Sequence, residues 1–172
     1  FNPAVTEAAK AKALDSTPDS TGDVIYFTAS SDDGPGVFSV PGNGGAVTKV
    51  FAGDPFAAPL GISISNDDKT LFVADPGAES NPDDPKTALG AIWSLPASGA
   101  APTALNGSSG TMPRGLDIGD DSGEETIFFT GVDAADGKPG LFKMPVGGGT
   151  PKAVAKGAPF VDPSGVAVGK TK

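Results

Sequence analysis

Short runs in which apolar and polar residues alternate recur along the chain, and each follows the same turn-rich phrase. The phrase reads G-x5-P-x-G and occurs at 53–61, 107–115 and 157–165. The run that follows has apolar residues at both ends, at 62–64, 116–118 and 166–168. An alternation with a period of two predicts half-buried β-strands. Because the phrase returns after roughly 50 residues, the chain is a repeat array.

The rest of the unit recurs in the same order. A second strand rich in β-branched and aromatic residues is predicted at 25–28, 71–74 and 127–130, and a third strand that ends in proline at 37–41, 92–96 and 141–145. A glycine-containing turn then opens a weaker fourth strand at 47–51, 103–105 and 152–155. Four short antiparallel strands in a unit of this length make one propeller blade. The pattern therefore predicts an all-β fold, a β-propeller of about three four-stranded blades.

The repeated pattern P-x-G-I-x-I, x-L-F-V-A-D, G-x-I-W-S-L-P and x-G-G resembles the blades of six-bladed β-propellers of the NHL, YWTD and gluconolactonase-like (SMP-30) families. It resembles especially secreted bacterial repeats that read IYFT…GxPGVFxxPxxGG. The resemblance covers residues 23–172 and implies half of a six-bladed ring. One such fold hosts many unrelated activities, so the resemblance implies the fold and not a ligand.

The limits of the array allow two alignments. Residues 1–5 resemble the tail of the loop phrase, whereas a second alignment makes 13–16 the first inner strand. We therefore divide the chain into an N-terminal arm or first inner strand at 1–22, with a short helix or a mobile arm over 6–14, and a three-blade segment at 23–172. In this reading the chain ends in the inner strand of a following blade. Three blades do not close a ring, so we expect a partner: a second copy, or further blades of a longer propeller.

Composition limits the chemistry that the chain can perform. It contains no Cys and no His, which removes thiolate and imidazole metal ligands and Ser-His or Cys-His nucleophile pairs. The formal net charge of −9 disfavours nucleic acid and anionic membranes as partners. No apolar run is long enough for a membrane span. On the resemblance and the start at Phe1 rather than Met, we expect a secreted, periplasmic or extracellular protein.

The geometry that the resemblance implies brings the G-x5-P-x-G loops together near the propeller axis. Candidate ligand-binding residues in these loops are Asp54, Phe56, Met112, Arg114, Phe160 and Asp162. Phe56 and Phe160 recur with the blade period, which favours packing between blades over ligand stacking. Arg114 is the only arginine and takes a position that is Leu60 or Ser164 in the sister phrases. It is expected to pair with a nearby carboxylate or with a bound anion.

Two acidic turns are candidate calcium sites, with Asp32 and Asp33 in one and Asp133 and Asp136 in the other. Neither has the EF-hand spacing, and turn formation by Asp-Gly accounts for both. We expect any bound metal to be a hard cation such as calcium, held by oxygen atoms. No catalytic residue stands out. The sequence therefore favours a non-catalytic binding or assembly module over a calcium-dependent lactonase or esterase like the gluconolactonases, because the axial loops contain no Glu.

Overall fold

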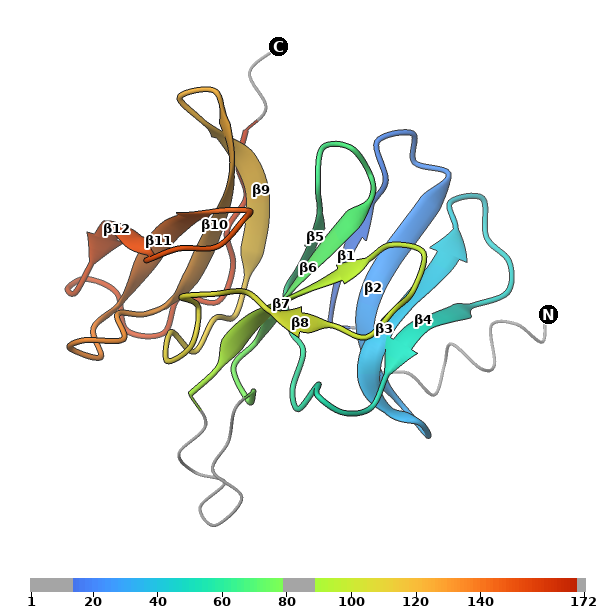
Figure 1. The fold of residues 1–172 in the computed structure, drawn as a ribbon, viewed down its shortest axis with the longest axis horizontal. Coiled ribbons are helices and arrows are strands. Elements are labelled where there is room, and N and C mark those ends of the chain that lie inside the picture. Colours follow the sequence, from blue (N-terminus) through green and yellow to red (C-terminus); the bar gives the residue numbers. More distant parts are fainter. Residues whose placement is uncertain (1–13, 79–88, 170–172) are drawn as a thin grey trace.

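The computed structural model describes residues 14–78 and 89–169, and within these residues it contains strands and no helix. Twelve strands form three four-stranded antiparallel sheets, each in simple sequential order. Figure 1 shows the sheets in succession, from the blue and cyan sheet through the green and yellow sheet to the orange and red one. The predicted all-β architecture of three propeller blades is confirmed. The alternative start at 1–5 and, apart from Leu14, the possible helix at 6–14 lie outside the described residues.

Each sheet contains four consecutive strands. The first sheet has β1 (Asp15–Pro18), β2 (Val24–Ser31), β3 (Gly34–Pro41) and β4 (Thr48–Ala52). The second has β5 (Ile62–Ile64), β6 (Thr70–Asp75), β7 (Ala91–Pro96) and β8 (Thr103–Ala104). The third has β9 (Leu116–Asp121), β10 (Glu124–Val132), β11 (Pro139–Pro145) and β12 (Lys152–Lys156).

The same strand register recurs in all three sheets. In the third sheet Phe129 pairs with Leu116 of β9 and with Phe142 of β11. The equivalent residue of the second sheet is Val73, which pairs with Ile62 and Trp93. In the first sheet Phe27 pairs with Ser16 and Phe38. The inner strand of the first sheet is thus β1, which lies two residues later than the strand at 13–16 of the second alignment, because Thr17 and not Asp15 takes the place of Asp117.

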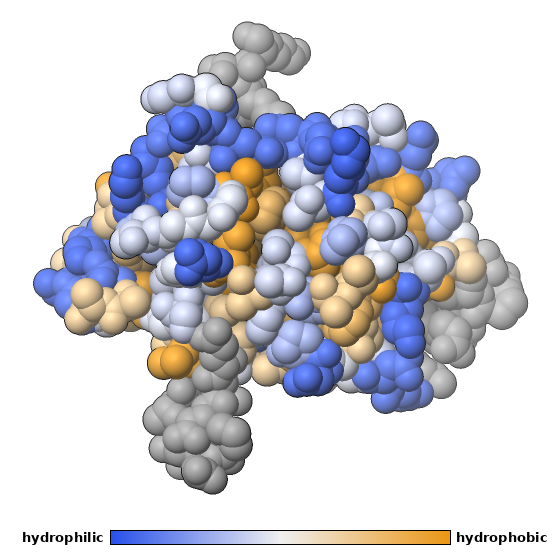
Figure 2. Space-filling view, viewed as in Figure 1, coloured by the Kyte–Doolittle hydropathy of each residue, from blue (hydrophilic) through white to orange (hydrophobic). Residues whose placement is uncertain are grey.

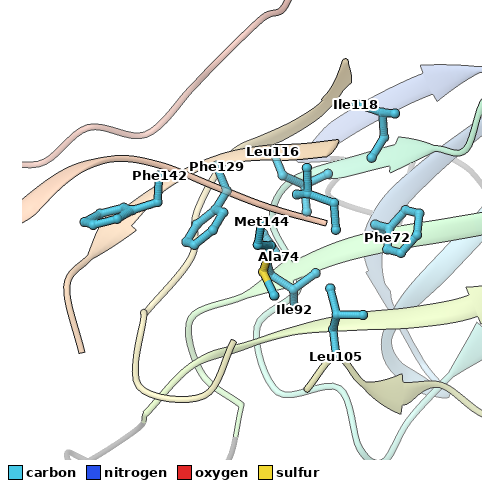
Figure 3. Packing of buried hydrophobic residues seen from close by; sticks show 10 residues of the cluster. Phe72, Ala74, Ile92, Leu105, Leu116, Ile118, Phe129, Phe142 and Met144 are labelled. Carbon is cyan, nitrogen blue, oxygen red and sulfur yellow. The ribbon is translucent and has the colours of Figure 1, made fainter. Parts of the chain in front are cut away.

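The cores lie between the sheets, because alternate residues of each central strand point to opposite sides. On β6, Leu71 and Val73 pack toward the first sheet, while Phe72 and Ala74 pack toward the third. Figure 3 shows how the latter meet Leu116 and other apolar residues of the third sheet. Each sheet is therefore stabilised mainly by its neighbours, as expected in a propeller.

The aromatic residue of the first loop phrase belongs to this packing. The Phe56 side chain is only 5% exposed and makes edge-to-face contacts with Phe51 of the first sheet and Trp93 of the second. The expectation that Phe56 packs between blades is confirmed, and Phe56 is not available to a ligand. Trp93 is buried as well, and its indole Nε1 has no hydrogen-bond partner within the described part of the chain.

The inner strands approach one another closely at the glycine that ends each loop phrase. A Cβ atom at Gly61 would lie 2.7 Å from the Arg114 carbonyl oxygen, and one at Gly115 would lie 2.6 Å from the Ser164 carbonyl oxygen. The Gly61 N–H donates to the Arg114 carbonyl at 2.8 Å. The final glycine of the phrase is therefore required for close contact between neighbouring inner strands.

Candidate axial binding site

Four consecutive backbone segments line the propeller axis: β1, β5, β9 and residues 164–168. A cavity lies at each end of this row. The cavity on the side of the G-x5-P-x-G loops has a volume of about 320 Å³, and the one at the opposite end has about 390 Å³. Figure 2 shows apolar surface in furrows between hydrophilic ridges on one side of the molecule. We refer to the two cavities as the loop-side and turn-side mouths.

Equivalent residues of the four segments surround the loop-side mouth. Leu14, Leu60, Arg114 and Ser164 occupy the same place in successive segments, each one residue before the position of Asp15, Gly61, Gly115 and Gly165. Among the described residues that line this mouth, Arg114 is the one cation. The scaffold does not require arginine here, because leucine or serine takes the same place in the sister segments.

A carboxylate of the neighbouring loop partners Arg114. The guanidinium Nη2 lies 3.0 Å from Oδ1 of Asp162, and the two side chains are 39% and 63% exposed. The expectation that Arg114 pairs with a nearby carboxylate is confirmed. An ion pair this exposed contributes little to stability. Because the Arg114 side chain is partly exposed, its guanidinium remains accessible to a second anion.

The other predicted axial residues do not line the loop-side mouth. Asp54 is exposed and Phe160 is half-buried. Met112 is 39% exposed and has a φ of 42°, and its N–H donates to the Leu89 carbonyl at 3.1 Å. Of the six predicted residues, the structure brings together Arg114 and Asp162.

Sequence analysis did not identify the turn-side mouth. Asp19 and Asp68 line it. Burial, and then the negative charges of these two carboxylates, raise the pKa of the Tyr26 hydroxyl above its ordinary value. Further inside, Asp117 accepts hydrogen bonds from the Ser63 hydroxyl at 3.2 Å and from the Val168 N–H at 2.8 Å. The signal in the sequence that could have indicated this mouth is the polar middle residue of β1, β5 and β9, which is Thr17, Ser63 or Asp117.

Asp75 is another residue whose role the sequence did not show. Its carboxylate is fully buried and accepts three backbone hydrogen bonds, from Ala57 at 2.8 Å, Ala58 at 2.9 Å and Gly77 at 3.0 Å. These bonds hold the first loop phrase against the end of β6. The corresponding residues of the sister strands are Ala29 and Gly131, so the repeat itself gave no indication of a buried carboxylate.

Lysines partner three of the four candidate calcium ligands. Lys156 contacts both Asp133 and Asp136, lowering the pKa of the Asp133 carboxyl below its ordinary value, and Lys49 lies 2.8 Å from Asp33. Asp32 is exposed. The two turns belong to the first and third sheets, so the structure does not combine them. Among the described residues no group of three or more acidic side chains is placed to hold a metal ion.

No family model and no curated protein matches the chain. Solved structures do match. A chain from the crystal structure of a nidogen/laminin complex matches with a TM-score of 0.69 at 19% identity, over 91% of this chain and 52% of that one. A structure described as TolB from Agrobacterium tumefaciens matches with a TM-score of 0.58 at 17% identity, over 85% of this chain and 49% of that one. Both likenesses are to the β-propeller fold, and this chain spans about half the length of each structure it matches. Within the described residues no helix is long and apolar enough to cross a membrane.

Proposed function

We propose that this chain is a non-catalytic binding module, an exported propeller segment that completes a ring with further blades and binds a carboxylate-bearing ligand at the loop-side mouth. The observation that supports ligand binding is Arg114. In the part of the chain that the structure describes, it is the one cation at the loop-side mouth, at a position where the blade scaffold accepts leucine or serine, and its ion pair with Asp162 is exposed. A guanidinium presents paired N–H donors that match a carboxylate.

Asp162 occupies the place that a ligand carboxylate would take. A ligand must therefore displace Asp162 or add to it, and the exposed geometry allows either. This arrangement predicts opposite effects for the two partners. Removing Arg114 weakens ligand binding, whereas removing the charge of Asp162 strengthens it.

The test uses Arg114 as its own reporter, because a single arginine gives a single side-chain Nε–Hε resonance. We expect a capped triglutamate peptide to shift this resonance in a saturable way. Arg114→Ala removes the reporter, so its affinity is measured by calorimetric titration with the same peptide; it should bind the peptide about 10- to 100-fold more weakly, for the loss of a charge-assisted hydrogen bond. Asp162→Asn should tighten it.

Lys143 provides the matched control for this experiment. It also forms an ion pair, at 2.6 Å from Asp121, and lies on the third sheet away from the axial mouths. Lys143→Ala should leave peptide binding unchanged. An Arg114 resonance that does not move at millimolar peptide, or a Lys143→Ala variant as weak as Arg114→Ala, would contradict the proposal.

The proposal of ring completion and export rests on two further observations. Each matched structure is about twice as long as the part that this chain covers, so a second set of blades of the same size would restore its full length. The added blades come from a second copy or from another chain. Export rests on the resemblance to secreted bacterial repeats.

A further inference from the structure

We propose that the ligand of the loop-side mouth is an aliphatic monocarboxylate, a molecule with one carboxylate on a short apolar chain. The inference rests on the proposed function, which assigns the carboxylate to Arg114, and it adds what the rest of the ligand is. It begins from the leucines that line the same mouth, Leu14 and Leu60. A site for an anion alone needs no apolar wall.

The backbone of the inner segments does not dictate which side chains surround the mouth. At three equivalent positions the backbone is held in the same way, because the N–H groups of Leu14, Leu60 and Arg114 each donate to the second strand of their own sheet, at 3.0, 2.8 and 2.9 Å. The same fixed frame therefore carries leucine twice and arginine once. Side chains on such a frame are held in place for a ligand more firmly than side chains on a loop.

The apolar wall of the mouth is open to solvent. Leu14 is 54% exposed, and Leu60 and Val166 are half-buried, although all three line the cavity. An aliphatic group that covers these side chains removes apolar surface from water on both partners, which is favourable roughly in proportion to the area covered. The wall therefore favours a ligand whose carboxylate is attached to a hydrocarbon chain.

The charges of the mouth favour a ligand with one negative charge. Among the described lining residues Arg114 is the cation and Asp15 is an anion. The Asp15 carboxylate is fixed in place, since it accepts hydrogen bonds from the Ser16 N–H at 2.9 Å and from the Ile62 N–H at 3.1 Å. A second carboxylate on the ligand would meet this like charge or the leucines, and either contact is unfavourable. A monoanion matches the mouth better than a dianion.

The size of the mouth favours a small molecule. Its volume of about 320 Å³ lies at the lower end of the range of about 300–1,000 Å³ that is typical of ligand pockets. A short free acid and the last residue of a peptide that ends in leucine present the same chemistry. Isocaproate and N-acetyl-leucine share the carboxylate and the branched chain, so their affinities distinguish the two sources. Equal affinities assign a peptide end, and weaker binding of N-acetyl-leucine assigns the free acid.

The main test follows the Arg114 side-chain resonance in titrations with straight-chain monocarboxylates from propanoate to hexanoate. We expect each added methylene to lower the dissociation constant about two- to fourfold, because it leaves water at the apolar wall. Adipate has the chain length of hexanoate and a second carboxylate. It should bind about tenfold more weakly than hexanoate, because its second charge has no cation to meet.

Exchanging the residues of two equivalent positions tests the apolar wall directly. Leu60→Ser introduces the side chain that its sister segment has at Ser164, and it should reduce the effect of chain length. Ser164→Leu is the reverse exchange and should increase the effect. Leu89→Ser is the matched control, because Leu89 is 49% exposed and is not among the described residues that line the mouth. Fluorescence of Trp93, buried between the first and second sheets, reports whether each variant is folded.

The outcomes separate this inference from the proposed function. Equal affinities from propanoate to hexanoate, adipate binding as tight as that of hexanoate, or a chain-length effect that ignores both Leu60→Ser and Ser164→Leu would overturn the aliphatic ligand and leave carboxylate binding in place. An Arg114 resonance that moves with neither the monocarboxylates nor the triglutamate peptide overturns both. A chain-length effect that falls in Leu60→Ser, rises in Ser164→Leu and is unchanged in Leu89→Ser supports the inference.

Discussion

At the scale of single residues, acidic side chains of this protein serve three different purposes. Asp75 is buried and organises a loop through backbone N–H groups, Asp133 neutralises a lysine, and Asp162 pairs with the axial arginine. All three are aspartates in loops or at strand ends, and their sequence surroundings look alike. The difference arises from burial and from partners that lie far away in the chain.

The carboxylate of Asp75 should contribute strongly to stability. Asp75→Ala leaves three backbone N–H groups without an acceptor at a buried site. Hydrogen bonds to charged groups contribute about 1.5–3 kcal/mol each, and not additively, so we expect the free energy of unfolding to fall by about 3 kcal/mol or more. Urea unfolding measures this loss. Asp54→Ala, at an exposed aspartate of the same loop, is the control, and an equal loss there would contradict the role assigned to Asp75.

Lys156 should control both the pH response and the calcium response of the acidic turn of the third sheet. Pairing with Lys156 lowers the pKa of the Asp133 carboxyl below its ordinary value of 3.8. A depressed carboxyl pKa gives stability that is present above the unfolded value and is lost as pH falls through the folded value. We therefore expect the contribution of this contact to begin to fall as pH drops below about 3.8 and to be lost once pH is below the lowered pKa of Asp133.

Substitution of Lys156 also tests whether the acidic turn of the third sheet can bind calcium. Lys156→Met frees the Asp133 carboxylate and leaves Asp136 with Lys138 alone, so calcium should bind this variant more tightly than the wild type in calorimetric titrations. Lys49→Met, which frees Asp33 alone, is the matched control and should change calcium binding less. Identical titrations for the wild type and Lys156→Met would show that this turn holds no calcium ligands.

At the scale of elements, the recurring phrase made most of the fold predictable. Proline and glycine at fixed spacing determined where β5 and β9 begin, because the glycine is needed for close contact between inner strands. β1 carries no such phrase, and the sequence alone left its position open between two alignments. The site was predictable in part. Arg114 stood out because it breaks the repeat, whereas its pairing with Asp162 depends on how neighbouring loops approach in space.

The closing glycine of the phrase offers a direct test of inner-strand contact. Gly61→Ala would place a Cβ atom 2.7 Å from the Arg114 carbonyl oxygen, and backbone on both sides limits relaxation. We expect a loss of about 1–3 kcal/mol in the free energy of unfolding, as for other overpacked sites. Gly147→Ala is the control, because nothing lies within 4 Å of its Cβ position. Equal stability of the two variants would mean that the inner strands are not in close contact.

At the scale of the whole molecule, the chain is a curved stack of three sheets with a net charge of −9 and two mouths at its axis. A net charge of this size repels a second copy at low ionic strength, so the ring completion proposed above would depend on short-range packing rather than on long-range attraction. Arg114, the only arginine of the sequence, is the cation among the described residues of the loop-side mouth, whereas the net charge of the protein is negative.

The way in which each loop phrase connects two sheets affects how fast the sheets can separate. Each phrase joins the outermost strand of one sheet to the inner strand of the next, so residues 164–168 extend one strand past the third sheet. Neighbouring sheets linked in this way cannot separate by simply parting two surfaces, because the Gly61 N–H also donates to the Arg114 carbonyl of the next inner strand. A ladder of backbone hydrogen bonds must first be peeled from a sheet, and that step resembles local unfolding. The opening of one sheet would then be set by the fraying rate of its short inner strand, and the backbone amides of β5 and β9 would exchange with solvent more slowly than those of the exposed outer strand β12.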